Sequence, residues 1–394
     1  MTKEIVILSG ARTAVGTYGG SLKDIPPTQL AATCVREAVA RASIEPQLVE
    51  QLVLGNVIHS EARDMYIARV AALEGGLAEH TTALTLNRLC GSGLQAVISA
   101  AQALMLGDAK VAVAGGAESM SRAGYLAPAL RWGQRMGDAA MIDMMSGVLT
   151  DPFGNGHMGM TAENVAREFN ISREQQDILA LESHLRAERA IRQGYFKQQI
   201  VPVELHSRRG PQVFDTDEHV RNDAHLEDFS KLRPVFQKDG RVTAGNASGL
   251  NDGAAALVLM QADMAEKQGL QPMARIVAYG HAGVSPAMMG IGPVQAVKNA
   301  LQRAGLNLPD MDVIESNEAF AAQACAVAQA LELDPEKTNP NGGAIALGHP
   351  IGASGAIITV KALYELQRTG GRYGLITMCV GGGQGIALII EAIH

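Results

Sequence analysis

The chain has few cysteines and lacks long apolar runs. Its four cysteines, at positions 34, 90, 325 and 379, have no C-x-x-C spacing, so free thiols in a reducing compartment are the simplest interpretation. No run approaches the roughly 18 apolar residues of a membrane span, and the N-terminus leads directly into a strand pattern. We therefore expect no signal peptide, no membrane span and a cytoplasmic location.

The chain also lacks an excess of positive charge. The net charge is −7, which gives no electrostatic reason to expect a nucleic acid partner. Apolar residues make up 47% of the chain and charged residues 19%, a composition typical of a well-buried globular protein. With 394 residues the chain is long for a single hydrophobic core, so two or three domains are expected.

Strand patterns and helical patterns alternate in the first part of the chain. Apolar runs at 4–10, 51–57 and 110–116 predict buried strands, and apolar residues at helical spacing predict helices at 27–42 and 93–106. Such alternation favours an α/β fold with a mostly parallel sheet that is covered on both faces.

The C-terminal part repeats this order. Strands are predicted at 274–280, 312–317 and 373–383, and helices at 293–304 and 354–368. Two copies of one βαβ-type unit are therefore expected. We place an N-terminal α/β domain at 1–120, completed by about 245–270, and a C-terminal α/β domain at 271–394.

Between the copies, residues 121–244 are rich in Met, Arg, Asp and His and have irregular spacing. We interpret them as an inserted domain of loops and helices over one end of the sheet, with a polar helix at 172–193. The segment 125–145 is amphipathic and fits a subunit contact equally well.

Two cysteines and one histidine stand in glycine-rich turns. Cys90 lies in NRLCGSG at 87–93, where a helix N-terminus can lower a thiol pKa and hold an oxyanion. Cys379 ends a strand and enters three glycines whose N–H groups can hold an anion, and His349 lies in a turn between them in sequence. A nucleophilic thiol, an acid/base thiol and an activating imidazole fit carbon–carbon bond chemistry on thioesters. Asn317, at the end of its own strand, is suited to hold a water or a carbonyl oxygen.

Structural roles compete with these interpretations. Buried cysteines are more often structural than reactive, and Cys34 and Cys325 fit that role because both lie in apolar helical patterns. A histidine such as His349 is more often a surface or core residue, but the surrounding glycines favour a ligand site. The G-x-G-x-x-G match at 154–159 does not follow a strand, and the glycine-rich stretch 342–355 lacks the Lys-Ser/Thr of a phosphate loop.

Several blocks of the sequence together resemble the thiolase family over the whole chain. The resemblance rests on RLCGSG at 88–93, NEAFAAQ at 317–323, GGAIALGHPIGASG at 342–355 and CVGGG at 379–383, with HMG at 157–159 and NASGLNDG at 246–253 similar to the family's coenzyme A contacts. The likeness extends to bacterial biosynthetic β-ketothiolases, including those that feed polyhydroxyalkanoate synthesis. It implies a layered αβαβα core with an inserted loop domain, and a homotetramer.

The resemblance also implies a mechanism. Cys90 would be the acylated nucleophile, His349 would take its proton, and Cys379 would move the α-proton of the second acetyl-CoA. Asn317, through a water, and His349 would hold the enolate oxygen, and the N–H groups of Cys90 and Gly381 the thioester oxygen. Ser248 would meet the pantetheine amide, Arg221 would lie near the adenine, and the tunnel would be lined by Leu149, His157, Met158, Met288, Ala319 and Phe320.

Acetyl-CoA, other acyl-CoA thioesters and CoA are thus the implied substrates, with no permanently bound cofactor and no metal. Two other classes remain as alternatives. A ketoacyl synthase shares the duplicated fold but uses one cysteine, which the second thiol at Cys379 argues against. A non-catalytic acyl-CoA or lipid carrier commonly loses part of the catalytic set, whereas Cys90, Asn317, His349 and Cys379 are all present.

Overall fold

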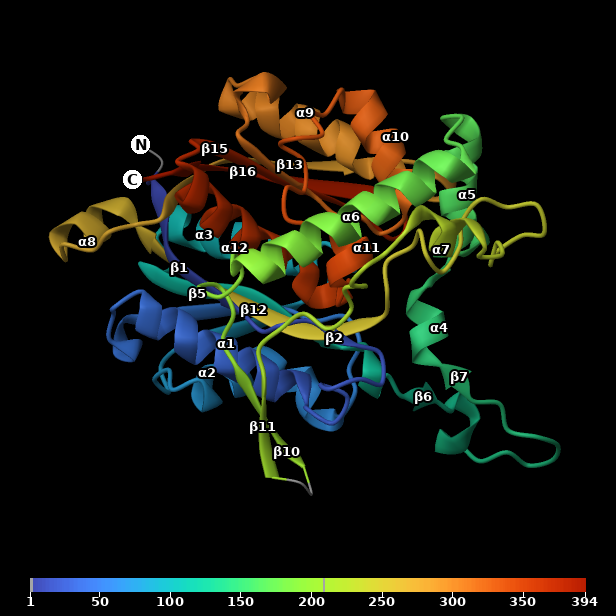
Figure 1. Ribbon diagram of the computed structural model, residues 1–394. Helices are drawn as coiled ribbons and strands as arrows, with labels where there is room; N and C mark the ends of the chain where they lie inside the picture. The colour runs from blue at the N-terminus through green and yellow to red at the C-terminus, as the bar shows by residue number, and fades with distance from the viewer. Residues whose placement is uncertain (1–2, 208–209) are drawn as a thin grey trace.

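In the computed structural model, which describes residues 3–207 and 210–394, two similar halves pack into five layers of helices and strands (Figure 1). The N-terminal half contributes five main strands and four helices, with a short β2 beside them. Their bounds are β1 Ile5–Arg12, β2 Gly16–Thr17, α1 Pro27–Arg41, β3 Gln51–Gly55, α2 Ile67–Glu74, β4 Thr82–Leu86, α3 Ser92–Leu106, β5 Val111–Ser119, β12 Asn251–Gln261 and α8 Ala262–Lys267.

The C-terminal half repeats this plan. Its strands follow the order β14-β15-β16-β13, as the first half follows β4-β3-β5-β12-β1, and the two halves join through a short β1–β13 pairing. The elements are β13 Ala274–Gly283, α9 Gly292–Ala304, β14 Val313–Ser316, α10 Ala321–Leu331, α11 Ala344–Leu347, α12 Ile351–Thr369, β15 Tyr373–Val380 and β16 Gln384–Ala392. The expected duplicated, layered α/β architecture is confirmed.

The prediction of a mostly parallel sheet is wrong. The sheet is mixed: β3 pairs in parallel with β4 and β5, and β14 with β15, but the other pairings are antiparallel. Three strands, β4, β12 and β16, did not appear in the alternating pattern. β16 follows β15 directly, and β12 comes only after the whole insertion, yet both lie antiparallel beside their neighbours β15 and β5. The alternation of strands and helices could therefore not reveal them.

Alternate residues of each strand face different layers. Leu52 and Leu54 of β3 pack with α1 and α2, whereas Val53 between them packs with α3 and α12. In the second half Leu375 of β15 packs with α9, and Ile376 faces the central helices. The helices α3 and α12 therefore form the middle layer, with a half-sheet on each side.

Close backbone packing in this middle layer requires glycine. A Cβ on Gly93 of α3 would lie 2.7 Å from the Ala356 nitrogen of α12, and a Cβ on Gly355 would collide with the Leu94 backbone. These two glycines thus serve helix packing rather than access of a ligand. The expectation that the glycines around Cys90 and His349 clear space for a substrate is wrong for this pair.

One segment of the described chain, Leu89–Leu106, is long and apolar enough on average to cross a membrane, although its sequence is not an unbroken apolar run. It covers α3, and 56% of it is buried inside the protein. A helix buried between two half-sheets is expected to be apolar on most sides. Its composition is therefore explained by its central position in the core.

The inserted segment carries short elements and one long helix. The long helix α6 starts with a capping box between Ser172 and Gln175 and ends at Gly194, whose φ is 74°. The bounds are β6 Tyr125–Leu126, β7 Ile142–Asp143, α4 Met144–Val148, β8 Thr150–Asp151, β9 Gly156–His157, α5 Met158–Glu168, α6 Arg173–Gln193, β10 Val203–Ser207, β11 Gly210–Phe214 and α7 Leu226–Ser230. The domain boundaries proposed from sequence stay a prediction.

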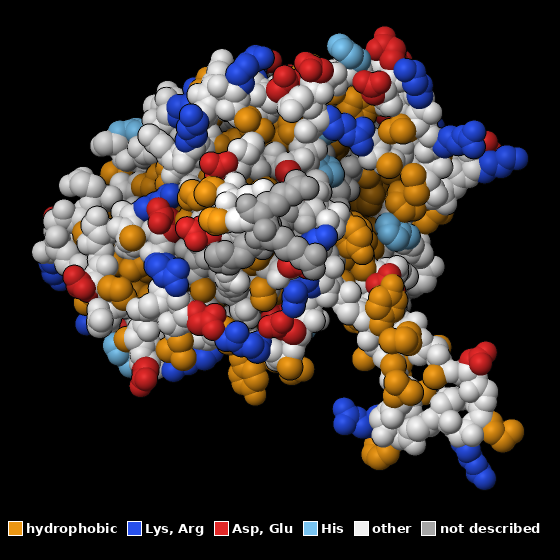
Figure 2. All heavy atoms as spheres, turned by 60° about the horizontal axis from the view of Figure 1, so that its bottom comes forward, with side chains coloured by type: hydrophobic (Ala, Val, Ile, Leu, Met, Phe, Trp, Pro, Cys, Tyr) orange, Lys and Arg blue, Asp and Glu red, His pale blue; other side chains and the backbone are white. Residues whose placement is uncertain are grey.

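The insertion has both a fixed part and a projecting part. A buried ion pair of Arg12 with Asp217, at 2.7 Å, ties it to the end of β1. The residues 125–143, which we call the arm, stand away from the body (Figures 1 and 2). The arm exposes large apolar side chains, among them Leu130 and Trp132, the latter 92% exposed.

Candidate active site

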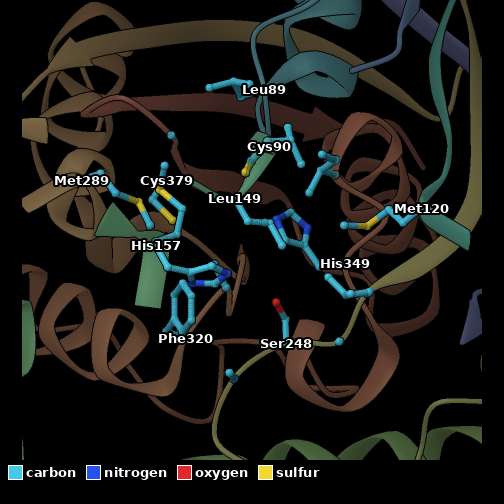
Figure 3. Close-up of a pocket in the computed structure, with 18 of the residues that line it drawn as sticks. Leu89, Cys90, Met120, Leu149, His157, Ser248, Met289, Phe320, His349 and Cys379 are labelled. Carbon is cyan, nitrogen blue, oxygen red and sulfur yellow. The ribbon is translucent and has the colours of Figure 1, made fainter. Parts of the chain in front are cut away.

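A largely apolar cavity of about 470 Å³ lies where the two halves meet the insertion. Figure 3 shows Cys90, His349 and Cys379 converging on it from the turn before α3, the turn before α12 and the end of β15. Its wall consists of Leu89, Cys90, Met120, Val148, Leu149, His157, Met158, Val235, Phe236, Thr243, Ala244, Ala247, Ser248, Gly249, Leu250, Met289, Ala319, Phe320, His349, Ile351, Cys379 and Gly381.

Cys90 sits on a tight turn between β4 and α3. The preceding Leu89 has a φ of +47°, which is uncommon for a residue other than glycine. The Ser92 hydroxyl fixes the turn: it accepts a hydrogen bond from the Arg88 N–H at 2.8 Å and donates one to the Leu89 carbonyl at 2.7 Å. Backbone strain of this kind is common at functional sites, where surrounding contacts must hold it.

Burial raises the pKa of the Cys90 thiol to about 11, although the backbone N–H groups of Gly381 and Cys90 itself act in the opposite direction. The expectation that the helix N-terminus would lower this pKa overall is therefore wrong. Desolvation of a thiolate in an apolar cavity outweighs two N–H groups. The thiol is neutral at pH 7 and needs a base to become a nucleophile.

His349 has a free ring nitrogen in the cavity wall. His349 precedes α12, and its backbone N–H donates a hydrogen bond to the Asn251 side-chain oxygen at 2.8 Å. The ring Nδ1 lies 2.6 Å from the Ser354 hydroxyl, whereas Nε2 is buried without a partner. Burial lowers the pKa of His349 to about 4, so the ring is neutral at pH 7 and able to accept a proton.

Cys379 is the penultimate residue of β15 and is only 1% exposed. Burial, and then the neighbouring Cys90, raises the pKa of the Cys379 thiol well above its usual range. The strand ends at Val380, and Gly382 and Gly383 follow with φ near 80° and 86°. These glycines let the chain turn sharply after the thiol.

Most of the residues predicted to contact coenzyme A line the same cavity: Leu149, His157, Met158, Ser248, Ala319 and Phe320. His157 caps α5, because its Nδ1 accepts a hydrogen bond from the Gly159 N–H at 3.0 Å, and its ring stacks on Phe236 with centroids 4.7 Å apart. The Ser248 N–H donates to the Ala319 carbonyl at 3.0 Å, which joins two of the predicted contact segments.

Three predicted residues do not line this cavity. Met288 is replaced in the wall by its neighbour Met289, because the chain kinks at Met288. Arg221 is exposed, with its guanidinium 5.8 Å from the Phe229 ring. Asn317 is 2% exposed and lines a separate cavity of about 20 Å³, on which Gly348 and Ser354 also border. Both polar atoms of its amide are buried there without a partner among the described residues.

Several wall residues were not predicted from the sequence. Leu89, Met120, Val148, Val235, Phe236, Leu250, Met289 and Ile351 line the cavity, and none was singled out. Leu89, Leu250 and Ile351 stand inside quoted motifs, so their neighbours could have pointed to them. Val235 and Phe236 come from an irregular loop of the insertion, and nothing local in the sequence indicates that they reach the site.

The other two cysteines lie outside the cavity. Cys34 is buried in α1, and burial raises its pKa to about 12. Cys325 lies on α10 beside a groove against α6, and burial raises its pKa likewise to about 12. In the ranges 3–207 and 210–394, no cluster of three or more His, Cys, Asp or Glu residues is arranged to hold a metal ion.

The chain is similar to known proteins over its full length. Residues 5–263 match the N-terminal domain of thiolases and residues 270–392 their C-terminal domain. A β-ketothiolase, BktB, of Cupriavidus necator is 66% identical, and an acetyl-CoA acetyltransferase of Syntrophomonas wolfei is 48% identical, each with 100% of both chains covered.

Solved structures agree. Human mitochondrial 3-ketoacyl-CoA thiolase superposes with a TM-score of 0.98 at 45% identity, with all of both chains covered. The same human enzyme in complex with CoA gives a TM-score of 0.97 at 44% identity, covering 100% of this chain and 99% of that one. This chain therefore belongs to the thiolase family and is an acyl-CoA C-acyltransferase.

Proposed function

We propose that the protein catalyses the reversible Claisen condensation of two acetyl-CoA molecules to acetoacetyl-CoA and CoA, and the thiolysis of 3-ketoacyl-CoA, through an acyl-Cys90 intermediate. The observation that carries this proposal is the convergence of two thiols and a neutral imidazole on one apolar cavity. A single cysteine with a histidine would suffice for acyl transfer alone. The second thiol adds a base for a carbon–carbon step that begins with removal of an α-proton.

In the first half-reaction, the Cys90 sulfur attacks the thioester carbonyl while His349 Nε2 takes the thiol proton. The carbon–sulfur bond of the thioester breaks, and CoA leaves as a thiol with the proton from His349. The N–H groups of Cys90 and Gly381, which donate to the Cys90 sulfur, are suited to stabilise the tetrahedral oxyanion. Charge therefore develops beside fixed donors inside a dry cavity.

In the second half-reaction, His349 Nε2 first takes the proton of Cys379, the Cys379 thiolate removes an α-proton from a second acetyl-CoA, and the resulting enolate attacks the acyl group on Cys90. A new carbon–carbon bond forms, the Cys90 carbon–sulfur bond breaks, and the proton held by His349 passes to the Cys90 thiolate, so both thiols end protonated. A protonated His349 Nε2 and a water held by Asn317 are suited to stabilise the enolate oxygen. The unpaired, buried amide of Asn317 supports such a water, because buried polar groups normally have a partner.

Coenzyme A is a substrate in this scheme, and no cofactor is permanently bound. The apolar wall suits the pantetheine arm, and Ser248 supplies a polar group partway along it. Arg221 is exposed in the insertion and free to meet the adenine nucleotide. Of the relatives, the human thiolase in complex with CoA supports this assignment.

The test is to trap the acyl-enzyme. Mixed with acetyl-CoA, the protein should gain one acetyl group, and mass spectrometry of its peptides should place the group on Cys90. Cys90→Ser should lose both the adduct and acetoacetyl-CoA cleavage by CoA, because a hydroxyl is a far weaker nucleophile. Cys325→Ser, a thiol outside the cavity, serves as the matched control. An adduct on Cys34 or Cys325 would contradict the proposal. If no cysteine carried an acetyl group, a non-catalytic carrier would be favoured.

We further propose that the protein is a cytoplasmic homotetramer, with a role in fatty acid metabolism and polyhydroxyalkanoate precursor synthesis. The exposed apolar side chains of the arm support assembly through this segment, since such patches mark contact surfaces. Light scattering should give four times the monomer mass, and replacing Leu130 and Trp132 with Ser should yield smaller particles. Cell fractionation and the polymer content of a deletion strain test the location and the role.

A further inference from the structure

The ring of His349 has one hydrogen-bond partner among the described residues, the hydroxyl of Ser354. Ser354 lies in the first turn of α12 and is 2% exposed. Its Oγ is 2.6 Å from His349 Nδ1 and 2.9 Å from the Pro350 carbonyl oxygen. Neither the chemistry above nor the motif comparison uses this hydroxyl.

The direction of these two hydrogen bonds follows from their partners. The Pro350 carbonyl only accepts, so the single hydroxyl proton of Ser354 must point to it. If that proton pointed to Nδ1 instead, a lone pair of the Ser354 oxygen would face a lone pair of the Pro350 carbonyl oxygen across 2.9 Å. The Ser354 oxygen is therefore left to accept, and Nδ1 must carry the ring proton and donate it.

This arrangement decides which nitrogen is basic. With the proton on Nδ1, Nε2 keeps its lone pair, and Nε2 is the buried, unpartnered nitrogen at the cavity. In the other tautomer, Nε2 would already carry a proton and could not accept one from Cys90. The hydrogen bond that one ring nitrogen makes sets the role of the other.

The remaining polar groups around His349 do not replace Ser354. In the part of the chain that the structure describes, the ring has no hydrogen bond to a carboxylate, and Glu118 reaches this turn only through the Gly352 N–H, at 2.8 Å. The other titratable or polar side chains of the main cavity wall are those of Cys90, Cys379, His157, Thr243 and Ser248. Arg12, Asn317 and Lys361 line the small cavity on which Ser354 also borders.

We propose that Ser354 is a positioning residue that holds His349 in the Nδ1–H tautomer and so leaves Nε2 free to accept the proton of Cys90. Ser354 does not touch the substrate; it acts through the imidazole. This inference rests on the proposed role of His349 as the base for Cys90. The same hydrogen bond stabilises the imidazolium that forms once the proton has moved, because Nδ1 remains a donor.

The experiment measures the single-turnover acetylation of Cys90 by mass spectrometry over a range of pH. Ser354→Ala should slow acetylation by about 10- to 100-fold, with the acetyl-CoA concentration for half-maximal rate nearly unchanged, because only proton transfer is affected. The acidic limb of the pH–rate profile of this variant should also move to lower pH, because the imidazolium loses a hydrogen-bond acceptor and the pKa of His349 falls. Ser354→Thr retains the hydroxyl and should recover most of the rate.

Thr359→Val is the matched control. Thr359 is fully buried in the same helix, and its hydroxyl makes the same kind of bond to the carbonyl four residues earlier, Gly355, at 2.7 Å. It therefore reproduces the loss of one hydroxyl–carbonyl bond from α12 without touching His349. Its melting temperature should fall as in Ser354→Ala while its acetylation rate stays at the wild-type value.

Two results would overturn the inference. One is a folded Ser354→Ala protein that acetylates at the wild-type rate while His349→Ala is slow; if His349→Ala is itself fast, the proposed role of His349 fails instead. The other needs no variant of Ser354. Solid-state ¹⁵N NMR of the histidine-labelled enzyme, with His349 assigned from His349→Ala, should show a protonated Nδ1 and a bare Nε2. A protonated Nε2 would contradict the inference even if every Ser354 variant misfolds.

Discussion

The Glu118 carboxylate of β5 accepts a hydrogen bond from the Gly352 N–H at 2.8 Å, which joins the first half of the protein to the N-terminus of α12. Gly352 lies three residues after His349, so this contact also holds the turn that carries the imidazole.

From this contact we predict that Glu118→Gln loses both stability and activity. The carboxylate also accepts from the N–H groups of Val57 and Ile58 and from the Asn56 amide. An amide group would turn one NH₂ toward these donors, so the free energy of unfolding should fall by about 2–4 kcal/mol, measured by urea denaturation. Acetylation of Cys90 by the folded variant should also slow, because the His349 turn loses its anchor.

Glu163→Gln is the control for this prediction. Glu163 is likewise buried and accepts the N–H groups of Arg241 and Val242, but it lies in the insertion and outside the cavity wall. It should lose comparable stability and keep its rate per folded molecule. Equal rates of Cys90 acetylation in the two folded variants would show that Glu118 does not support the active site beyond its contribution to stability.

The second prediction separates the two thiols. If Cys379 only moves the α-proton, Cys379→Ser should still be acetylated at Cys90 but fail at condensation and thiolysis. Solvent deuterium should enter the methyl group of acetyl-CoA in the wild type and much more slowly in this variant, as followed by mass spectrometry. Rapid exchange in Cys379→Ser would assign the proton to another group, and loss of acetylation would place Cys379 in the first step.

The third prediction concerns Arg221. Because its side chain is exposed and outside the cavity, Arg221→Ala should raise KM for CoA and leave kcat nearly unchanged. We expect an increase of about 5- to 10-fold, since an exposed ionic contact contributes on the order of 1 kcal/mol. Arg192→Ala, another exposed arginine of the insertion, should change neither constant. A large loss of kcat at saturating CoA would show that Arg221 takes part in the chemistry.

The fourth prediction is a pH dependence of stability. His184 is 1% exposed, its Nδ1 accepts the Arg221 N–H at 3.1 Å, and burial, then the charge of Arg221, lowers its pKa to about 3. The unfolded histidine titrates near 6.5, so between these values the unfolded state binds the extra proton. This contribution to stability is complete above about pH 6.5 and is lost as the pH falls, by up to about 1.4 kcal/mol per pH unit.

His184→Asn tests that prediction, because the Asn oxygen can accept the same hydrogen bond and does not titrate. Its free energy of unfolding should fall less steeply than that of the wild type between about pH 6.5 and 4. Parallel curves for the two proteins would mean that His184 is not responsible. The histidines His281 and His349, whose pKa values are also lowered to about 4, should supply the slope that remains.

Local patterns predicted the helices closely. The helix expected at 27–42 is Pro27–Arg41, and that expected at 293–304 is Gly292–Ala304. Each helix has a proline in its first two positions, which favours a helix start, and α9 is followed by Gly305, which favours a helix end. These signals are local and therefore readable from the sequence. Strand pairing was not predictable in this manner, because hydrogen bonds between strands join residues far apart in sequence. The antiparallel returns of β12 and β16 were accordingly missed.

The sequence by itself determined which groups are present: two thiols, an imidazole and an asparagine, each at the end of a strand or in a turn next to a helix. Only the tertiary structure decided the pKa values of these groups and which residues surround them. Burial in an apolar cavity raises the pKa of Cys90 and lowers that of His349, the reverse of what a helix N-terminus alone would do to the thiol. Desolvation depends on every wall residue at once, including Val235 and Phe236 from the insertion, so no local motif can encode it.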